Sequence, residues 1–265
     1  MISKISKSAV DFWAALLRYE LVSTLGWHDV KQRYRRSTIG PFWITLSMGI
    51  TIGVIGTVFS QIFNTPARQY VPFLAIGMIL WTFISTTITE SCSSFIASDL
   101  IIKQLPIPLF VHVLRVIWRN IIVMAHNAVI FPLVLIITGG TLDWIAFLTI
   151  PGLFLVILNL TWAGLFLAII CTRYRDLPQI IVSFLQVIFY LTPIMWLPSL
   201  MPEKGALFLL DFNPFYHLFE VVRRPLLGGF PDPANWLVAI WFCIVGWLTT
   251  VLLYARYRLR ITYWL

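Results

Sequence analysis

Long apolar segments, separated by short stretches that hold most of the charge, are the feature that most restricts how this chain can fold. Of the 265 residues, 59 % are hydrophobic and only 11 % are charged. A soluble domain of this size carries about a quarter charged residues. The chain is therefore expected to be an all-α polytopic membrane protein, because several of its apolar segments approach the roughly 20 residues needed to cross about 30 Å of hydrocarbon.

The apolar segments predict six transmembrane helices. We place them at about residues 40–63, 71–89, 116–138, 144–170, 178–196 and 236–254. Pro193 and Pro198 complicate a single-helix interpretation of the fifth. The chain then divides into a cytoplasmic N-terminal segment, residues 1–39, and a transmembrane domain, residues 40–265.

The junction Lys31–Trp43, KQRYRRSTIGPFW, fixes the orientation of this plan. Four cations precede the first apolar segment: Lys31, Arg33, Arg35 and Arg36. Each would cost roughly 2.5 to 3.5 kcal/mol inside the hydrocarbon, and positive charge is retained on the cytoplasmic side. With this end inside, 15 of the 19 Lys and Arg residues fall on cytoplasmic segments. We expect a membrane protein with both termini in the cytoplasm.

The N-terminal segment contains apolar residues at helical spacing from about Ala9 to Gly26. This pattern predicts an amphipathic helix lying in the headgroup layer, or a short helix packed on a soluble partner. Charged residues interrupt any apolar core of a cleavable signal peptide, so we expect the N-terminus to be retained.

A polar loop with one apolar face follows the second span, at residues 90–110. Pro106 and Pro108 stop any helix there, and Ser98 is a candidate N-cap for a short helix that ends at Gln104. Such a helix could dock in a cleft of a soluble partner, or the stretch could be an ordinary interfacial loop.

At the start of the third span, His112, Arg115 and Arg119 are spaced three and four residues apart, which places them on one helix face. That face could bind a lipid phosphate or pyrophosphate. Arginines that extend to the interface give the same pattern without any ligand.

The polar-rich segment at residues 197–235 is predicted to hold a short amphipathic helix on the outer face, possibly re-entrant. Asn213 should cap it, Pro214 should begin it, and Gly228 with Gly229 should end it. Glu220 can pair with Arg223 or Arg224.

Several classes of function are disfavoured. The cations cluster beside apolar runs, which is typical of topology determination and not of nucleic-acid binding. Three cysteines without metal-ligand spacing predict neither a disulfide framework nor a zinc site. The spans lack the buried ionisable groups of ion-coupled transporters, and no phosphate-binding glycine-rich loop is present. Asp211, His217 and Glu220 could form an acid/base set, but capping, pairing and solvation explain them more simply.

Aromatic residues make up 15 % of the chain. Most Trp and Tyr near the predicted span ends should anchor the helices at the membrane interface. Rings within spans could instead face a passage and contact sugars, although ordinary packing is the simpler interpretation. These candidate channel aromatics are Phe59, Phe83, Phe184, Phe189 and Tyr190.

Four ordered segments, YRRSTIGPFW, RYRDLPQ, TPIMW and NPFYHLFEVVRRPLLGG, together with the basic amphipathic N-terminus, resemble the permease subunits of ABC-2 type polysaccharide exporters. The resemblance extends over essentially the whole chain. It implies a location in the bacterial inner membrane, and a homodimer of six-span subunits that pairs with two copies of a separate nucleotide-binding subunit. ATP and magnesium would be bound by that partner, with no cofactor in this chain. The cargo would be an O-antigen or capsule chain on an undecaprenyl pyrophosphate carrier.

The resemblance also suggests roles for particular residues. The loop at 90–110 looks like a coupling helix that docks on the ATPase, through Ser98, Asp99, Leu100, Ile101, Lys103 and Gln104. The segment after Asn213 looks like the outer gate helix, with Phe215, Tyr216, Phe219, Glu220, Arg223 and Arg224. We further hypothesise that cations at the cytoplasmic mouth hold the carrier's pyrophosphate, namely Arg35, Arg36, Arg115 and Arg119. An ABC-2 permease for drugs or lipids, or a membrane-embedded glycan-modifying enzyme, are the alternatives.

Overall fold

A computed structural model describes residues 2–33, 35, 42–200 and 210–265, and within this part of the chain the fold is entirely helical. The helices are α1 (Ile2–Leu17), α2 (Tyr19–Arg33), α3 (Phe42–Ile62), α4 (Ala67–Cys92), η1 (Ile96–Ser98), α5 (Asp99–Gln104), α6 (Phe110–Ala128), α7 (Ile130–Thr138), η2 (Trp144–Leu148), α8 (Thr149–Arg173), α9 (Leu177–Leu191), η3 (Pro198–Leu200), α11 (Pro214–Leu226) and α12 (Pro233–Trp264).

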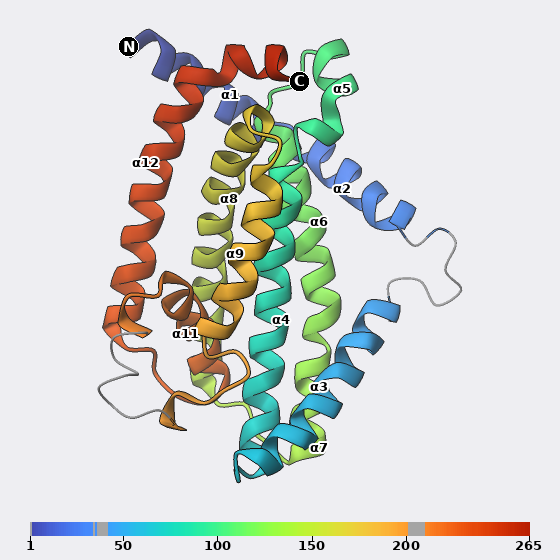
Figure 1. The fold of residues 1–265 in the computed structure, drawn as a ribbon, viewed down its shortest axis with the longest axis vertical. Coiled ribbons are helices and arrows are strands. Elements are labelled where there is room, and N and C mark those ends of the chain that lie inside the picture. Colours follow the sequence, from blue (N-terminus) through green and yellow to red (C-terminus); the bar gives the residue numbers. More distant parts are fainter. Residues whose placement is uncertain (1, 34, 36–41, 201–209) are drawn as a thin grey trace.

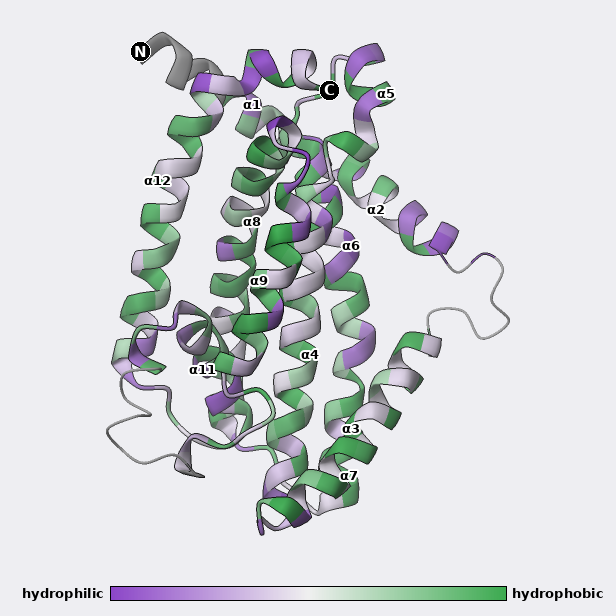
Figure 2. Cartoon of the chain, in the orientation of Figure 1, coloured by the Kyte–Doolittle hydropathy of each residue, from purple (hydrophilic) through white to green (hydrophobic). Residues whose placement is uncertain are grey.

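The long helices run side by side, and the short elements gather at their two ends (Figure 1). Both chain termini, α1 and α5 lie at one end, which we call the terminal end, whereas α11 lies toward the other, which we call the α11 end. Figure 2 shows hydrophobic residues along the long helices, with hydrophilic residues on α5, at the end of α2 and on the last part of α12. This distribution is expected of a membrane protein whose middle faces lipid and whose two ends face water.

Within the described residues, five helical segments are long and apolar enough to cross a membrane: Phe42–Ile62, Ala67–Cys92, Phe110–Thr138, Trp144–Arg173 and Pro233–Trp264. They correspond to five of the six predicted spans. Gly40 and Pro41, predicted to begin the first span, lie outside the described residues. The chain is a multi-pass membrane protein.

The predicted fifth span, residues 178–196, is shorter in the structure than expected. Its helix, α9, has 15 residues and ends at Leu191. The next residue, Thr192, is extended with ψ 137°, because the ring of Pro193 disfavours helical backbone in the residue before it. At 1.5 Å per residue, α9 is about 22 Å long, less than the hydrocarbon thickness.

The chain after α9 turns back into the protein with its carbonyl groups hydrogen-bonded. The Tyr70 hydroxyl donates to the Met195 carbonyl oxygen at 2.5 Å, and Arg223 Nη1 donates to that of Pro193 at 2.5 Å. Ile194 between them is fully buried. Non-helical backbone at membrane depth is tolerated only where protein or water satisfies its polar groups, and these contacts do so here.

The N-terminal region contains two helices, not the single helix predicted from about Ala9 to Gly26. The break falls at Arg18, between α1 and α2. Both helices contact α6, and α1 also packs on α12. The change of direction lets α1 reach α12 while α2 lies against α6 (Figure 1).

The last helix is longer than the predicted span at 236–254. The basic stretch that follows Tyr254 continues the helix to Trp264, and this part turns across the terminal end (Figure 1). It is held to α1 because Arg258 Nη1 donates to Asp11 Oδ2 at 2.5 Å. Tyr254 and Ile261 are fully buried, so the tail is part of the packed structure.

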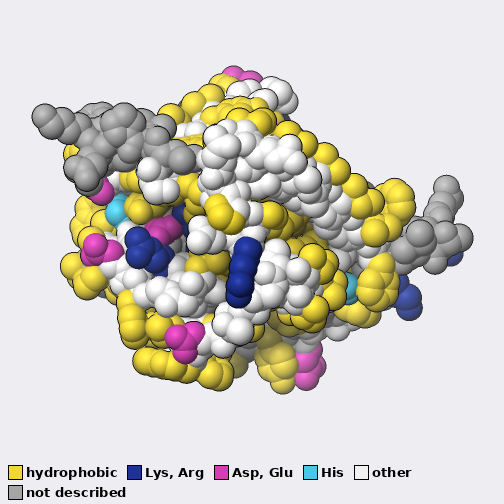
Figure 3. All heavy atoms as spheres, turned by 90° about the horizontal axis from the view of Figure 1, so that it is seen from below, with side chains coloured by type: hydrophobic (Ala, Val, Ile, Leu, Met, Phe, Trp, Pro, Cys, Tyr) yellow, Lys and Arg dark blue, Asp and Glu magenta, His cyan; other side chains and the backbone are white. Residues whose placement is uncertain are grey.

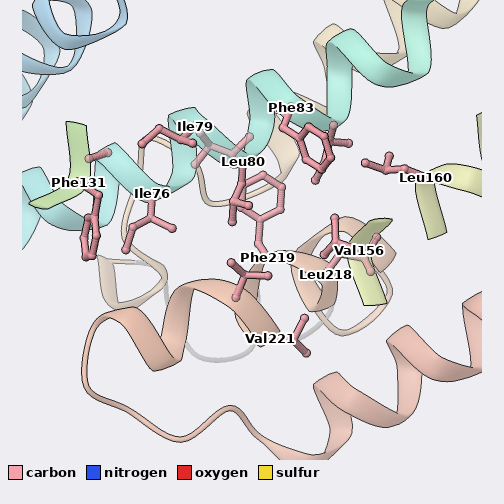
Figure 4. Close-up of a cluster of buried hydrophobic side chains, with 14 of the residues drawn as sticks. Ile76, Ile79, Leu80, Phe83, Phe131, Val156, Leu160, Leu218, Phe219 and Val221 are labelled. Atoms are coloured by element: carbon pink, nitrogen blue, oxygen red, sulfur yellow. The ribbon is translucent and has the colours of Figure 1, made fainter. Parts of the chain in front are cut away.

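The main hydrophobic core joins α4, α7, α8 and α11. Figure 4 shows Ile79 and Phe83 of α4 near Phe219 of α11 and Leu160 of α8. Phe219 has no exposed surface. The apolar face of the short helix α11 is therefore inserted into the bundle, which fixes the position of its charged residues at the α11 end.

Candidate functional site

The candidate coupling helix lies at the terminal end, as two short elements between α4 and α6. A 3₁₀ turn, η1, leads into α5, which ends at Gln104 as predicted. Phe95 and Ile102 are buried in the core of this end, whereas Leu100 is 71 % exposed. Lys103 forms an ion pair with Asp99 at 2.8 Å. The helix is anchored on one side and presents an apolar residue on the other.

One detail of this helix differs from the prediction. Ser98 occupies the N-cap position of α5, but its side chain makes no capping hydrogen bond, and its residue is mostly buried. Because η1 precedes α5 directly, the N–H groups of the first turn can bond backwards along the chain. The Asp99 N–H, for instance, donates to the Ile96 carbonyl oxygen.

A cluster of charged side chains connects α2, α4 and α6 close to this loop. We call it the terminal cluster: Asp29 and Arg33 of α2, Glu90 of α4, and Arg115 and Arg119 of α6. Asp29 binds Arg115 through two hydrogen bonds, of which that from Nε measures 2.7 Å, and it accepts a third from Arg119 at 3.1 Å. Two parallel bonds to one carboxylate are the strongest geometry available to arginine.

Glu90 is the second carboxylate of the terminal cluster. It accepts from Arg33 at 2.6 Å, from Arg119 at 2.6 Å and from the Asn120 amide at 2.7 Å. Arg119 thus bridges the two carboxylates. The side chains of Asp29, Glu90 and Arg119 are between 10 % and 22 % exposed, so water screens these contacts only partly.

The backbone of α2 approaches α6 closely at Gly26. A Cβ atom there would lie 2.8 Å from Trp118 Cδ1 and 3.3 Å from the Arg115 carbonyl oxygen. Such contacts are too short for any residue with a side chain, so glycine permits the approach that brings Asp29 to Arg115.

The terminal cluster connects the helices on both sides of the loop at residues 90–110. Glu90 precedes the loop by a few residues, and Arg115 and Arg119 follow it. A force on α5 acts on both flanking helices, and both are tied through carboxylates to α2. This arrangement can transmit a displacement of the loop to the N-terminal helices and to the bundle.

The four arginines predicted to hold a pyrophosphate are not equivalent in the structure. Arg115 and Arg119 are brought together, but their guanidinium groups already bind Asp29 and Glu90. Arg35 is exposed, and Arg36 lies outside the described residues. His112, expected on the same face, is buried, and no partner for either ring nitrogen is found in the described part of the chain.

The short amphipathic helix predicted after Asn213 is present as α11. The Asn213 side chain accepts from the Phe215 N–H at 3.0 Å and the Tyr216 N–H at 3.4 Å, which confirms the cap. Pro214 begins the helix, and Gly228 follows it with φ +81°. The predicted pairing is also confirmed, since Glu220 binds both Arg223 and Arg224. We call these three residues the α11 cluster.

Arg223 is the most deeply buried charged residue of the α11 cluster. It is 1 % exposed, donates twice to Glu220 Oε1, and lies 4.1 Å from the centre of the Phe73 ring. It also donates to the Pro193 carbonyl oxygen, as described above. Two partners and an aromatic face compensate this buried charge.

The proposed channel aromatics lie in different environments. Phe83 is 2 % exposed within the core, so its ring has no surface to offer a sugar in this conformation. Phe189 is partly buried and contacts Trp81, and Phe59 contacts Phe63. Phe184 and Tyr190 of α9 are 61 % and 65 % exposed. These two are the rings of the set best placed to face another molecule.

The alternative acid/base set does not converge. His217 Nδ1 contacts the Asn235 side-chain oxygen at 2.7 Å, and Nε2 contacts the Asp211 backbone oxygen at 3.0 Å, not its carboxylate. Glu220 is occupied by two arginines. No grouping of acidic, histidine and cysteine side chains that could hold a metal is found among the described residues.

Sequence reasoning missed Asp29, Glu90 and Asn120. Asp29 and Glu90 were charged residues near span ends without an assigned partner, and Arg115 lies 86 residues from Asp29. The available signal was charge balance, because partly buried arginines require carboxylates nearby.

The fold defines the class of protein first: a helical multi-pass membrane protein whose polar loop is tied to its N-terminal helices. Comparison with known proteins then gives the family. The ABC-2 type transporter family matches residues 20–227, so the chain belongs to this family, as a transmembrane permease subunit and not an enzyme. Permeases of this class work with an ATP-binding cassette ATPase subunit.

Two relatives illustrate the similarity. The chain is 24 % identical over 213 residues to an O-antigen export system permease protein RfbA of Klebsiella pneumoniae. The aligned region covers 80 % of this chain and 82 % of the relative. It is also 25 % identical over 206 residues to an O-antigen export system permease protein RfbA of Myxococcus xanthus. That aligned region covers 75 % of this chain and 76 % of the relative.

Proposed function

We propose that this chain is the channel-forming subunit of an exporter that moves polysaccharide linked to undecaprenyl pyrophosphate out of the cytoplasm. The cargo would be an O-antigen or capsule chain. The names of the relatives support this choice of cargo. The single structural observation that supports a driven permease is the terminal cluster, which ties α2 to both helices that flank the coupling loop.

The proposed orientation places the terminal end in the cytoplasm of a bacterium and the α11 end in the periplasm. It is supported by the distribution of cations. The basic part of α12, with Arg256, Arg258 and Arg260, lies at the same end as the terminal cluster, whereas Arg68, Arg223 and Arg224 lie on segments assigned outside. On this orientation both termini are cytoplasmic.

The proposed assembly has two copies of this chain and two copies of the ATPase. The exposed apolar Leu100 of α5, beside Lys103 and Gln104, supports docking of the ATPase at this loop. The partner would bind ATP and magnesium, and this chain would bind neither. A second copy would face helices with exposed apolar surface, of which α9 offers Phe184 and Tyr190.

The carrier's pyrophosphate is proposed to pass the cations of the cytoplasmic mouth. Because Arg115 and Arg119 are already bound to carboxylates, the exposed Arg35 is the cation most available for a first contact. Replacing Arg35 by Gln should lower export at normal protein level, whereas unchanged export would remove it from this role. Replacing Arg115 and Arg119 by Gln tests whether these two arginines also contact the pyrophosphate. Unchanged export at normal protein level would exclude them from this role.

The function as a whole is tested by deleting the gene and restoring it on a plasmid, while surface polysaccharide and carrier-linked polymer inside the cell are measured. We expect surface polymer to disappear on deletion, carrier-linked polymer to accumulate in the cytoplasm, and an ATPase to co-purify with the chain. Normal surface polymer in the deletion strain, with altered efflux of lipids or drugs, would contradict the proposal. Activity of the purified chain on a glycan without any ATPase would contradict it as well.

A further inference from the structure

A small pocket with both polar and apolar walls lies beside α11, on the face of the molecule opposite the terminal end. It has a volume of about 380 Å³, within the range of small-molecule sites, which is about 300–1,000 Å³. Its walls include Ser199, Tyr216, Glu220, Arg223 and Arg224. Figure 3 shows basic and acidic side chains next to each other on this face, with hydrophobic side chains around them.

The Glu220 carboxylate in this pocket has one hydrogen-bond acceptor position without a donor. Glu220 Oε1 accepts from Arg223 twice, and Oε2 accepts from Arg224 Nε at 3.0 Å. A carboxylate offers about four acceptor positions, so one remains on Oε2. The side chain of Glu220 is only 6 % exposed, so an unused acceptor position here is more costly than one in water.

Arg224 supplies donors next to that acceptor. Its side chain is 56 % exposed, and it uses Nε to hold Glu220. In the part of the chain that the structure describes, its two terminal nitrogens have no hydrogen-bond partner. The pocket therefore presents one acceptor and several donors side by side, in a fixed geometry set by the buried pair of Glu220 and Arg223.

Tyr216 adds a ring and a hydroxyl group to the same wall. Burial raises the pKa of this hydroxyl, and the Glu220 carboxylate raises it further. The group is thus protonated near neutral pH and can donate a hydrogen bond. A tyrosine that is apolar along its ring and polar at its tip suits a ligand with both kinds of surface.

We infer that this pocket binds one neutral sugar unit of the exported chain through two neighbouring hydroxyl groups. One hydroxyl donates to Glu220 Oε2, and the other accepts from the terminal nitrogens of Arg224, while the sugar packs beside Tyr216. The inference rests on the proposed function, because it takes the cargo to be a glycan. Because an ionised Glu220 can only accept hydrogen bonds, the ligand group at its free acceptor position must be a donor, which a sugar hydroxyl is and a carboxylate or phosphate oxygen is not.

The binding test uses the permease purified with its ATPase in lipid nanodiscs. The probes are neutral trisaccharides of mannose, galactose or rhamnose, and binding is followed by saturation-transfer NMR. We expect at least one probe to bind, and we expect Arg224→Gln to reduce the signal at least fivefold and Tyr216→Phe at least twofold. Arg68→Gln is the matched control: its target is an exposed arginine on another outer segment that donates to the Gly139 carbonyl oxygen, and the signal should be unchanged.

Three outcomes would overturn the inference: no neutral probe binds to the unaltered complex, Arg224→Gln binds as well as the unaltered protein, or glucuronic-acid trisaccharides bind more tightly than neutral ones. The folding of each variant is checked by size-exclusion chromatography after heating. Arg224→Gln is expected to fold, because it leaves the buried pair of Glu220 and Arg223 in place. A parallel assay of surface polymer separates the two proposals. If deletion of the chain stops export while Arg224→Gln changes neither binding nor export, only the pocket assignment fails.

Discussion

The two ends of the molecule each hold arginines around carboxylates, and they are built in different ways. The α11 cluster comes from a single helix turn, with Glu220 three and four residues before its arginines. The terminal cluster joins three helices whose charged residues are up to 90 positions apart. One is a local feature, and the other exists only when the chain has folded.

The two clusters also differ in how deeply their side chains are buried, and therefore in how rigid they are expected to be. In the α11 cluster, Arg223 is 1 % exposed and also donates to the Pro193 carbonyl oxygen in the turn after α9. In the terminal cluster every side chain retains some contact with water, and Arg33 is 44 % exposed. A sealed cluster fixes one conformation, whereas a partly solvated one between separate helices can rearrange at lower cost. The comparison predicts a rigid α11 end and an adjustable terminal end, where the ATPase is proposed to act.

The largest expected effect is on the sealed cluster. Replacing Arg223 by Gln leaves Glu220 buried with less compensation and removes the donor to Pro193, so we expect a loss of about 3–5 kcal/mol in stability. The measurement is the fraction of monodisperse protein after heating in detergent. Arg224→Gln, at an exposed position of the same cluster, should lose no more than about 1 kcal/mol. Equal losses would show that burial does not distinguish the two arginines.

The next effect concerns the terminal cluster. Asp29→Asn removes the charge that holds Arg115 and Arg119, and we expect a loss of about 2 kcal/mol together with reduced surface polymer at matched protein level. Glu20→Asn, at an exposed acidic residue of the same helix, is the control and should leave both unchanged. Normal export from the Asp29 variant would mean that the cluster does not transmit the motion of the loop.

A packing change sharpens the same comparison without altering charge. Gly26→Ala places a methyl group 2.8 Å from Trp118, so α2 must shift, and we expect a loss of about 1.5 kcal/mol. Gly49→Ala on α3 is the matched control because nothing lies within 4 Å of the added atom; this variant should be neutral or slightly stabilising. Thermal stability of both variants is compared directly. A stable Gly26 variant would mean that the approach of α2 to α6 is not tight.

The smallest expected difference is between two helix caps. Asn213→Ala removes two hydrogen bonds to backbone N–H groups of α11 and the bond that Asn213 Nδ2 donates to the Thr192 hydroxyl, and it should lose at least about 1 kcal/mol. Ser98→Ala removes no capping bond at α5 and should change stability by less than about 0.5 kcal/mol. Both are read from the same heating curve. A larger loss of stability for Ser98→Ala would indicate that the Ser98 hydroxyl makes a stabilising contact within the chain.

Local patterns predicted more of the fold than of the candidate site. Five spans, the helix ending at Gln104 and the cap at Asn213 follow from apolar length, prolines and capping chemistry, all of which act within a few residues. The length of α9 was overestimated because apolar residues continue beyond Leu191, while the backbone preference before Pro193 ends the helix. The pairing of Asp29 with Arg115 could not be predicted, because no periodicity connects residues so far apart.

The sequence by itself determined that this chain crosses a membrane several times, and it determined which side is rich in cations. Both follow from the free energy of moving side chains into hydrocarbon, which depends on residue type and hardly on neighbours. Only the tertiary structure decided which carboxylate neutralises which arginine, and that α9 gives way to a buried turn held by Tyr70 and Arg223. The reason is physical: hydrogen bonds and ion pairs act over a few ångströms, so their partners are set by how helices pack and not by their order in the chain.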